Sequence, residues 1–332
     1  HNTEKWGSIR DRYSGANRDE LKRVIKKIVD TPYEEFDEWD DRPLRTWLAQ
    51  YTSDEGVMDV FEYVTVLECM TDNWYDHSAS DSLYVRKLHL QDAQKTGFSF
   101  WPVGGWDRMW ANFEAAITNN GGEIRMNTPV TRVVIEDDQV KGVMVPVDGF
   151  LPNTDLQEEF IEAPAVISTL PVWYVLNIFD PGALPLWYEN QIRYLAQDKF
   201  RVSLLGIHIA TEEPVPILDR LELSTWLHSP RARVPGFLFE QTAMDPETAP
   251  DGVYLYSMGG VIPGAKGRDR VYLRETMEAF HRDVEDMYPG FENAVWSRRS
   301  LIFDPPFGVI QMPMLVGSYR PDWRAPNIDG LW

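Results

Sequence analysis

The spacing of apolar residues changes along the chain, and this change limits the fold more than any other feature of the sequence. In the N-terminal part the apolar residues recur three and four positions apart, as on the buried face of a helix, at Leu21, Val24, Ile25 and Ile28. After residue 122 they gather in short β-branched runs separated by turn residues. Runs of helices and runs of strands that do not alternate regularly predict an α+β protein.

Helices are expected over most of residues 1–95. Asn17 stands as an N-cap before the first helical pattern, and Pro43 precedes a second at Leu44–Tyr51. Ser53 is the expected cap of a third helix at Asp54–Met70. The stretch Asn73–Leu90 shows no clear period, so no helix is predicted there.

The segment from 101 to 170 changes character. An amphipathic helix is predicted to begin at Trp106 and to end before Gly121-Gly122. A three-stranded meander is expected next, with strands at Glu123–Met126, Val130–Ile135 and Val140–Val145. The run Ala165–Leu170 lacks alternation, which predicts a strand covered on both faces.

A second sheet and a long helix are predicted in the C-terminal half. The expected strands are Arg201–Ala210, Leu221–His228, Gly236–Gln241, Val253–Gly259 and Val295–Ile302, and the expected helix is Arg268–Met287. The predicted fold is therefore α+β, with a helical layer from 1–95 on a large mixed sheet. The helix and meander of 101–170 form a separate, incomplete piece.

Charge and composition restrict the partners and the chemistry. The net charge of −20 argues against nucleic acid as a partner, and no apolar stretch reaches the roughly 20 residues of a transmembrane helix. Cys69 is the single cysteine, which excludes an intramolecular disulfide and favours a cytoplasmic location. It lies in a helical pattern and is interpreted as a small buried residue. No local metal motif is present, so no metal is predicted.

Five pieces of sequence, in order, resemble one family. They are Pro102–Gly105, a helix, Gly121–Val133, Val140–Val143 and Ala165–Pro171. Together they closely resemble the middle of the FAD-dependent phytoene desaturase and amine oxidase superfamily. The tail Ser318–Trp332 resembles the approach to the C-terminal flavin motif of that family. The resemblance covers residues 100–332 well and the helical part loosely.

The resemblance implies a domain organisation and an incomplete cofactor site. Residues 1–100 would be the helical part of a substrate domain, 101–170 a segment of a discontinuous FAD domain, and 171–332 the substrate sheet leading back to it. Neither the Gly-x-Gly-x-x-Gly turn that seats the FAD pyrophosphate nor the closing flavin motif matches any part of this sequence. We therefore expect the sequence to be the central fragment of a longer enzyme, with a separate chain supplying the rest as the alternative.

The resemblance also implies site residues. Backbone groups at Val130 would bind the adenine of FAD, and Thr169, Leu170 and Pro171 would lie at the crossing between the two domains, near the nucleotide. Gly104 and Gly105 would let the backbone approach flavin or substrate, although a tight turn before the helix is an equal alternative. Trp101, Trp106 and Phe307 would line an apolar substrate cavity, with packing at each position as the alternative. No catalytic residue is identified.

Hydride transfer from an apolar substrate to flavin is the function that the resemblance favours. In many amine oxidases of the superfamily a Lys on the first long strand of the substrate sheet holds a water near the flavin, whereas Arg201–Ala210 contains no Lys. A hydrophobic, isoprenoid-like substrate is therefore preferred to an amine. A binding module that has lost the flavin is the non-catalytic alternative. The fragment alone is expected to be inactive, to bind FAD poorly, and to associate with another copy or partner that covers its incomplete flavin domain.

Overall fold

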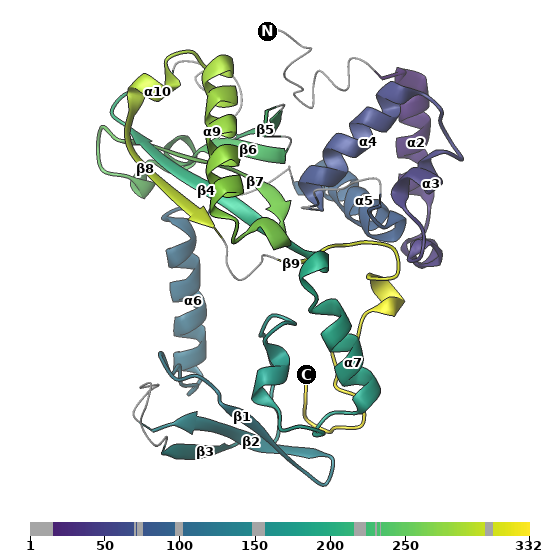
Figure 1. Cartoon of the computed structure of the whole chain (residues 1–332), viewed down its shortest axis with the longest axis vertical. Helices are drawn as coiled ribbons and strands as arrows, with labels where there is room; N and C mark the ends of the chain where they lie inside the picture. Colours follow the sequence, from purple (N-terminus) through teal and green to yellow (C-terminus); the bar gives the residue numbers. More distant parts are fainter. Residues whose placement is uncertain are drawn as a thin grey trace. The chain divides into compact units, whose positions relative to one another are not determined.

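The computed structural model describes residues 16–69, 71, 76–96, 102–147, 157–215, 224–229, 231–232, 234–302 and 308–332. The chain divides into two compact units (Figure 1). Unit 1 combines residues 1–109 with 198–319, and unit 2 combines 110–197 with 320–332. No described helix is both long enough and apolar enough to cross a membrane.

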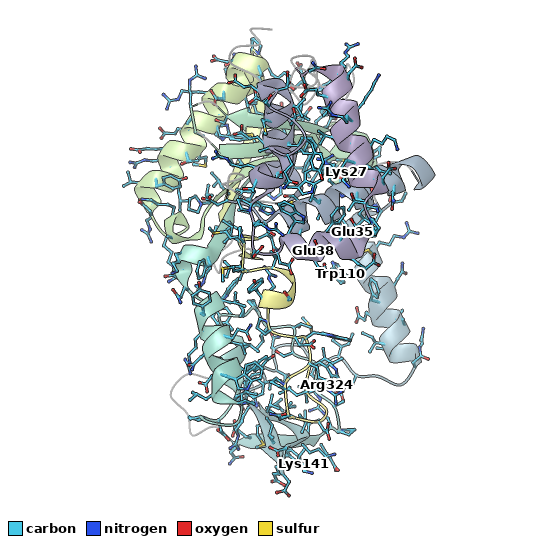
Figure 2. The ribbon with its side chains drawn as sticks, turned by 90° about the vertical axis from the view of Figure 1, so that its right-hand side faces the viewer. Lys27, Glu35, Glu38, Trp110, Lys141 and Arg324 are labelled. Atoms are coloured by element: carbon cyan, nitrogen blue, oxygen red, sulfur yellow. The ribbon has the colours of Figure 1, made fainter. Side chains whose placement is uncertain are left out.

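A group of helices opens unit 1. Its members are α2 (Arg18–Asp30), η1 (Tyr33–Trp39), α3 (Leu44–Leu48), α4 (Glu55–Glu68) and α5 (Ala79–Thr96). The Asn17 side chain accepts hydrogen bonds from the backbone of Asp19 and Glu20, which confirms the predicted cap of α2. Asp54 caps α4 by accepting from Val57, in place of the predicted Ser53. The exposed side of the group carries charge, including Lys27, Glu35 and Glu38 (Figure 2).

Helix α5 was not predicted because a lysine takes one of its buried positions. Ala79 and Leu83 are fully buried at a spacing of one turn, and the next position on that face is Lys87, which is also buried. Its ammonium group donates to the carbonyl of Thr31 and lies 4.5 Å from the centre of the Tyr33 ring. The aliphatic stem thus fills a core position that a pattern of apolar residues cannot show.

The large sheet of unit 1 has the order β5-β6-β7-β4-β8, with β9 pairing to the start of β4. Its strands are β4 (Arg201–Thr211), β5 (Ser224–Ser229), β6 (Val234–Glu240), β7 (Tyr254–Pro263), β8 (Val295–Ile302) and β9 (Gly308–Val309). Every described pair is antiparallel, so the prediction of a mixed sheet is wrong. The strands themselves lie close to the predicted ranges.

Helix α9 (Arg270–Met287) covers one face of this sheet (Figure 1). Phe280 and Val284 of the helix pack in one core with Ile207, Tyr256 and strand residues beside them. The approach is close: a Cβ on Gly236 would lie 2.4 Å from the Phe280 ring. Each such buried side chain contributes about 1.5–3 kcal/mol of hydrophobic free energy, so this layer is the stable centre of the unit.

Unit 2 contains a three-stranded antiparallel sheet made of β1 (Arg132–Glu136), β2 (Gln139–Pro146) and β3 (Glu158–Glu162). The predicted meander is thus present, but its third strand is β3. Glu123–Met126 is not a strand, because Arg125 pairs there with Glu123 in exposed chain that turns at Asn127, where φ is +54°. The unit also contains most of α6 (Gly105–Asn119), together with η2 (Val175–Ile178) and α7 (Leu186–Leu195).

The end of the chain returns to the centre of unit 2. Val166 donates to the carbonyl of Gly330 at 2.7 Å and accepts from the Trp332 N–H at 2.9 Å, in a single parallel bridge. Ala165–Leu170 is therefore not the predicted strand covered on both faces, and Ile167 is 74% exposed. Arg324, labelled with Lys141 in Figure 2, donates to Asp329 at 3.2 Å and helps to hold this return.

Candidate functional site

The two faces of the large sheet differ in chemistry. On β4 and β7 the side chains that point toward α9 include the buried Leu205, Ile207 and Ile209 of β4 and the buried Tyr256 of β7. The opposite face carries His208 on β4 and Ser257 on β7, which are directly opposed in the ladder. The same face also carries apolar residues, among them Leu204 and Val261, so one polar pair lies on a largely apolar, partly exposed face, as in many ligand sites.

A directed chain of hydrogen bonds crosses this second face. The Gln241 amide, in the short helix α8 (Gln241–Met244), donates to Ser257 Oγ at 2.8 Å. Ser257 Oγ lies 2.8 Å from His208 Nδ1. Ser257 Oγ has one proton and two acceptor sites, so it can accept from Gln241 and donate to Nδ1, the arrangement that places the imidazole proton on Nε2.

Partial burial keeps this imidazole neutral. Desolvation lowers the pKa of His208 below the ordinary value of 6.5. At neutral pH the ring is therefore uncharged, and with its proton on Nε2 it offers that N–H as a hydrogen-bond donor on this face of the sheet. The contact with Ser257 gives Nδ1 a hydrogen-bond partner inside the protein.

Aromatic side chains flank the polar residues. Phe237 and Phe239 of β6 are half-buried and stack with ring centres 4.6 Å apart and planes 8° from parallel. Phe239 is opposite Ser257 in the ladder, and Phe237 is opposite Gly259. Gly259 in turn pairs with Gly206 of β4. We call the side chains of His208, Ser257, Gln241, Phe237 and Phe239 the sheet-face cluster.

The predicted glycine turn is tied to the same part of unit 1. Gly104 and Gly105 have φ values of +81° and +75°, which an L side chain rarely adopts. The Gly104 N–H donates to Asp245 Oδ2 at 2.6 Å, and Asp245 is buried. Asp245 follows α8 directly and donates its own N–H to the carbonyl of Gln241 at 2.9 Å. The glycine turn and the sheet-face cluster are therefore anchored to one short segment.

Of the three predicted substrate residues, one lies in the described part of the chain. Trp106 is half exposed in the first turn of α6. Trp101 and Phe307 lie outside the described residues. The proposed cavity between Trp106 and Phe307 stays a prediction.

The predicted nucleotide residues all lie in unit 2. Val130 is 37% exposed, and no described residue makes a hydrogen bond to its backbone. Thr169 and Leu170 are exposed and Pro171 is partly exposed, immediately after the bridge between Val166 and the chain end. These positions are accessible to a ligand, and their role in binding one stays a prediction.

Sequence reasoning missed Ser257, Gln241 and Asp245. Ser257 reaches His208 through strand pairing, and Gln241 reaches Ser257 through a tertiary hydrogen bond. A single sequence carries no signal for either contact. Asp245 could have been found locally, since it precedes Pro246 and accepts from the Glu247 N–H at 3.1 Å as the cap of η5 (Pro246–Thr248).

Comparison with solved structures shows the fold. An oxidoreductase from Methanosarcina mazei aligns over 97% of this chain and 68% of its own, with a TM-score of 0.68 and 16% identity. A putrescine oxidase variant aligns over 85% of this chain and 60% of its own (TM-score 0.58, 17% identity), and cyclohexylamine oxidase from Brevibacterium oxydans over 87% and 61% (TM-score 0.51, 15% identity). The chain therefore spans roughly two thirds of these structures or less.

Comparison of the sequence identifies the family. No curated protein matches significantly. The sequence model described as "Flavin containing amine oxidoreductase" matches residues 22–324, which is most of the chain and includes the helical part where the resemblance was loose. This chain thus belongs to the flavin-containing amine oxidoreductase family.

Proposed function

We propose that the chain is the substrate-binding and central part of an FAD-dependent oxidoreductase that oxidises a largely apolar substrate. The observation that carries this proposal is the sheet-face cluster, which combines stacked aromatic rings with one directed polar group in a family of flavin enzymes. The rings would hold the apolar body of the substrate. Nε2–H of His208 would orient a polar or electron-rich group.

The residues present fit the adenine end of FAD. Val130 is 37% exposed and its backbone makes no hydrogen bond among the described residues, and unpaired backbone groups of this kind suit the edge of an adenine ring. Thr169, Leu170 and Pro171 are accessible in the same unit. Bound FAD would supply the acceptor for the hydride, while the protein residues bind and orient the substrate and exclude water.

An amine is the second candidate substrate. The family and two of the similar structures, the putrescine and cyclohexylamine oxidases, favour it, and a net charge of −20 attracts cations. Against it, β4 contains no Lys. With its proton on Nε2, a neutral His208 donates there rather than accepts, so it would bind an ammonium group poorly.

Anaerobic reduction of the flavin tests both substrates. The complete natural protein that contains this chain, loaded with FAD, is mixed with a polyene or with a primary alkylamine, and bleaching of the flavin absorbance is followed. We expect the polyene to reduce the flavin. Phe239→Ala should raise KM about two- to tenfold, in line with the loss of an aromatic contact of roughly 0.5–1.5 kcal/mol. Val271→Ala, exposed on α9, is the matched control and should change nothing.

Two results would contradict this proposal. Reduction by the amine alone would replace the apolar substrate with the second candidate. A complete protein that is colourless and cannot be reconstituted with FAD would support the non-catalytic binding module. The 332-residue chain by itself is expected to bind FAD poorly, because it retains only the adenine-side residues and the crossing between the domains. Tight FAD binding, measured by fluorescence titration, would show that this expectation is wrong.

A further inference from the structure

Three potential metal ligands meet at the junction of α4 and α5. Cys69 is the C-cap residue of α4, His77 lies just before α5, and Asp81 is in the first turn of α5. One ligand atom from each residue lies within 4.8 Å of the others. No metal motif was predicted here because the seven residues between Cys69 and His77 exceed the spacing of a local zinc motif.

The backbone around His77 is well anchored. Its carbonyl accepts from the Leu44 N–H at 2.9 Å, and the next residue, Ser78, donates to the carbonyl of Gln311 at 2.7 Å. The imidazole is fully buried, whereas Cys69 and Asp81 are partly exposed. The cluster therefore has a fixed interior ligand and a route to solvent, which a metal site requires.

Hydrogen bonding within the protein leaves this imidazole incompletely satisfied. Nε2 of His77 lies 3.0 Å from Asp81 Oδ2, but the buried Nδ1 has no hydrogen-bond partner among the described residues. A buried polar atom without a partner is unfavourable by about 1–3 kcal/mol. The nitrogen that faces the cluster is Nε2, so an ion there would take the place of the hydrogen bond to Asp81, with Nε2 and the carboxylate both as ligands.

The donor set selects the ion. A thiolate, an imidazole and a carboxylate are the ligand types of Zn²⁺, whereas Mg²⁺ and Ca²⁺ prefer oxygen alone. The two negative ligands balance a divalent charge. In a tetrahedral zinc site, neighbouring ligand atoms are about 3.3–3.6 Å apart, so movements of about 1 Å would close the cluster. We propose that Cys69, His77 and Asp81 bind a divalent transition-metal ion, preferentially Zn²⁺, with water at the fourth position.

Cobalt titration of the 332-residue chain tests this site, because Co²⁺ bound to a thiolate gives a charge-transfer band in the near ultraviolet. After treatment with a chelator, we expect one equivalent of Co²⁺ to produce the band and Zn²⁺ to displace it. Cys69→Ser should abolish the band, and both Cys69→Ser and Asp81→Asn should weaken Zn²⁺ affinity by more than about 100-fold, the upper limit for loss of an outer partner. His89→Gln, exposed on the same helix, is the matched control and should bind as the wild type does.

The substituted side chains are partly exposed, so the two variants should fold, and circular dichroism checks this. The test does not substitute His77, because this side chain is fully buried. Failure of the wild type to bind one equivalent would overturn the proposal. Binding without the thiolate band, or equal Zn²⁺ affinity in the folded Cys69→Ser variant, would overturn it as well, since the ion would then be held by exposed carboxylates.

Discussion

Helices α9 and α6 have the same kind of sequence and opposite environments. Both carry apolar residues at helical spacing, and both were predicted from that pattern. In α9 the stripe is buried against the large sheet, with Phe280 and Val284 at its centre. In α6 no residue is buried, and Trp110, Phe113 and Ile117 are 61%, 56% and 45% exposed.

The difference teaches what a periodic pattern can establish. The spacing predicts a helix and identifies the apolar face that must be buried. The surface that buries this face belongs to another element. For α9 that element is present in the described structure. For α6 the exposed stripe agrees with a chain that spans only about two thirds of related structures, and its cover stays a prediction.

The largest difference between the two helices should appear in stability. Phe280→Ala removes a ring packed beneath Gly236 and should lower the free energy of unfolding by about 3–5 kcal/mol. Phe113→Ala, the matched change on α6, should alter it by no more than about 0.5 kcal/mol. Urea denaturation of the 332-residue chain measures both values. Equal losses would mean that α6 is covered in solution.

A smaller effect is expected from a buried polar group beneath α9. The Val215 N–H donates to the Tyr256 hydroxyl at 3.0 Å, and both residues are buried. Tyr256→Phe leaves this donor without a partner and should lower the free energy of unfolding by about 1–3 kcal/mol. Phe in place of the exposed Tyr319 is the control and should have little effect.

The Tyr256 hydroxyl also gives the stability of unit 1 a pH dependence. Burial raises its pKa from 10.0 to about 12. Between these values the unfolded state has lost the proton that the folded state retains, so stability falls as pH rises. Denaturation at pH 9 to 11 should show this fall in the wild type and a shallower one in Tyr256→Phe; identical slopes would assign the effect to other groups.

The sequence predicted elements whose reasons are local and missed those whose reasons are tertiary. The start of α2 at its Asn17 cap and the ranges of α9 and β8 agree with the structure. Helix α5 was missed because Lys87 occupies a core position through its stem and its contact with Tyr33. The strand predicted at Ala165–Leu170 was wrong, because the segment forms only one bridge, at Val166, while Ile167 and Leu170 are exposed.

The candidate site divides in the same way. Positive φ at Gly104 and Gly105 fits the alternative interpretation, a tight turn before the helix, since glycine tolerates this backbone; their approach to flavin or substrate stays a prediction. The carboxylate that holds the turn, Asp245, lies 141 positions away in the sequence. The partners of His208 likewise come from separate segments. A single sequence contains the groups of such a cluster but not their distances.

The exposed stripe of α6 should also affect association. An apolar surface of this kind favours contact with a second copy or another protein, so the 332-residue chain is expected to sediment as more than a monomer. Trp110→Glu should shift it toward the monomer by placing a charge in the stripe, while the same change at the exposed Tyr84 of α5 should not. A strictly monomeric wild type in sedimentation velocity would contradict the expectation.

The smallest effect expected is a pH dependence on the polar face of the sheet. Desolvation depresses the pKa of His208, so below its ordinary pKa of 6.5 the unfolded state takes up a proton that the folded state still refuses. The contribution of the neutral His208 to the free energy of unfolding is therefore complete above about pH 6.5. It is lost as pH falls from there toward the lower pKa of the folded state. Urea denaturation between pH 7.5 and 5.5 should show this loss, and His208→Gln should lack that component of the slope. Substitution of the exposed His89, in His89→Gln, should leave this pH dependence unchanged. If His208→Gln shows the wild-type slope, other groups cause the pH dependence and burial does not hold the His208 imidazole neutral.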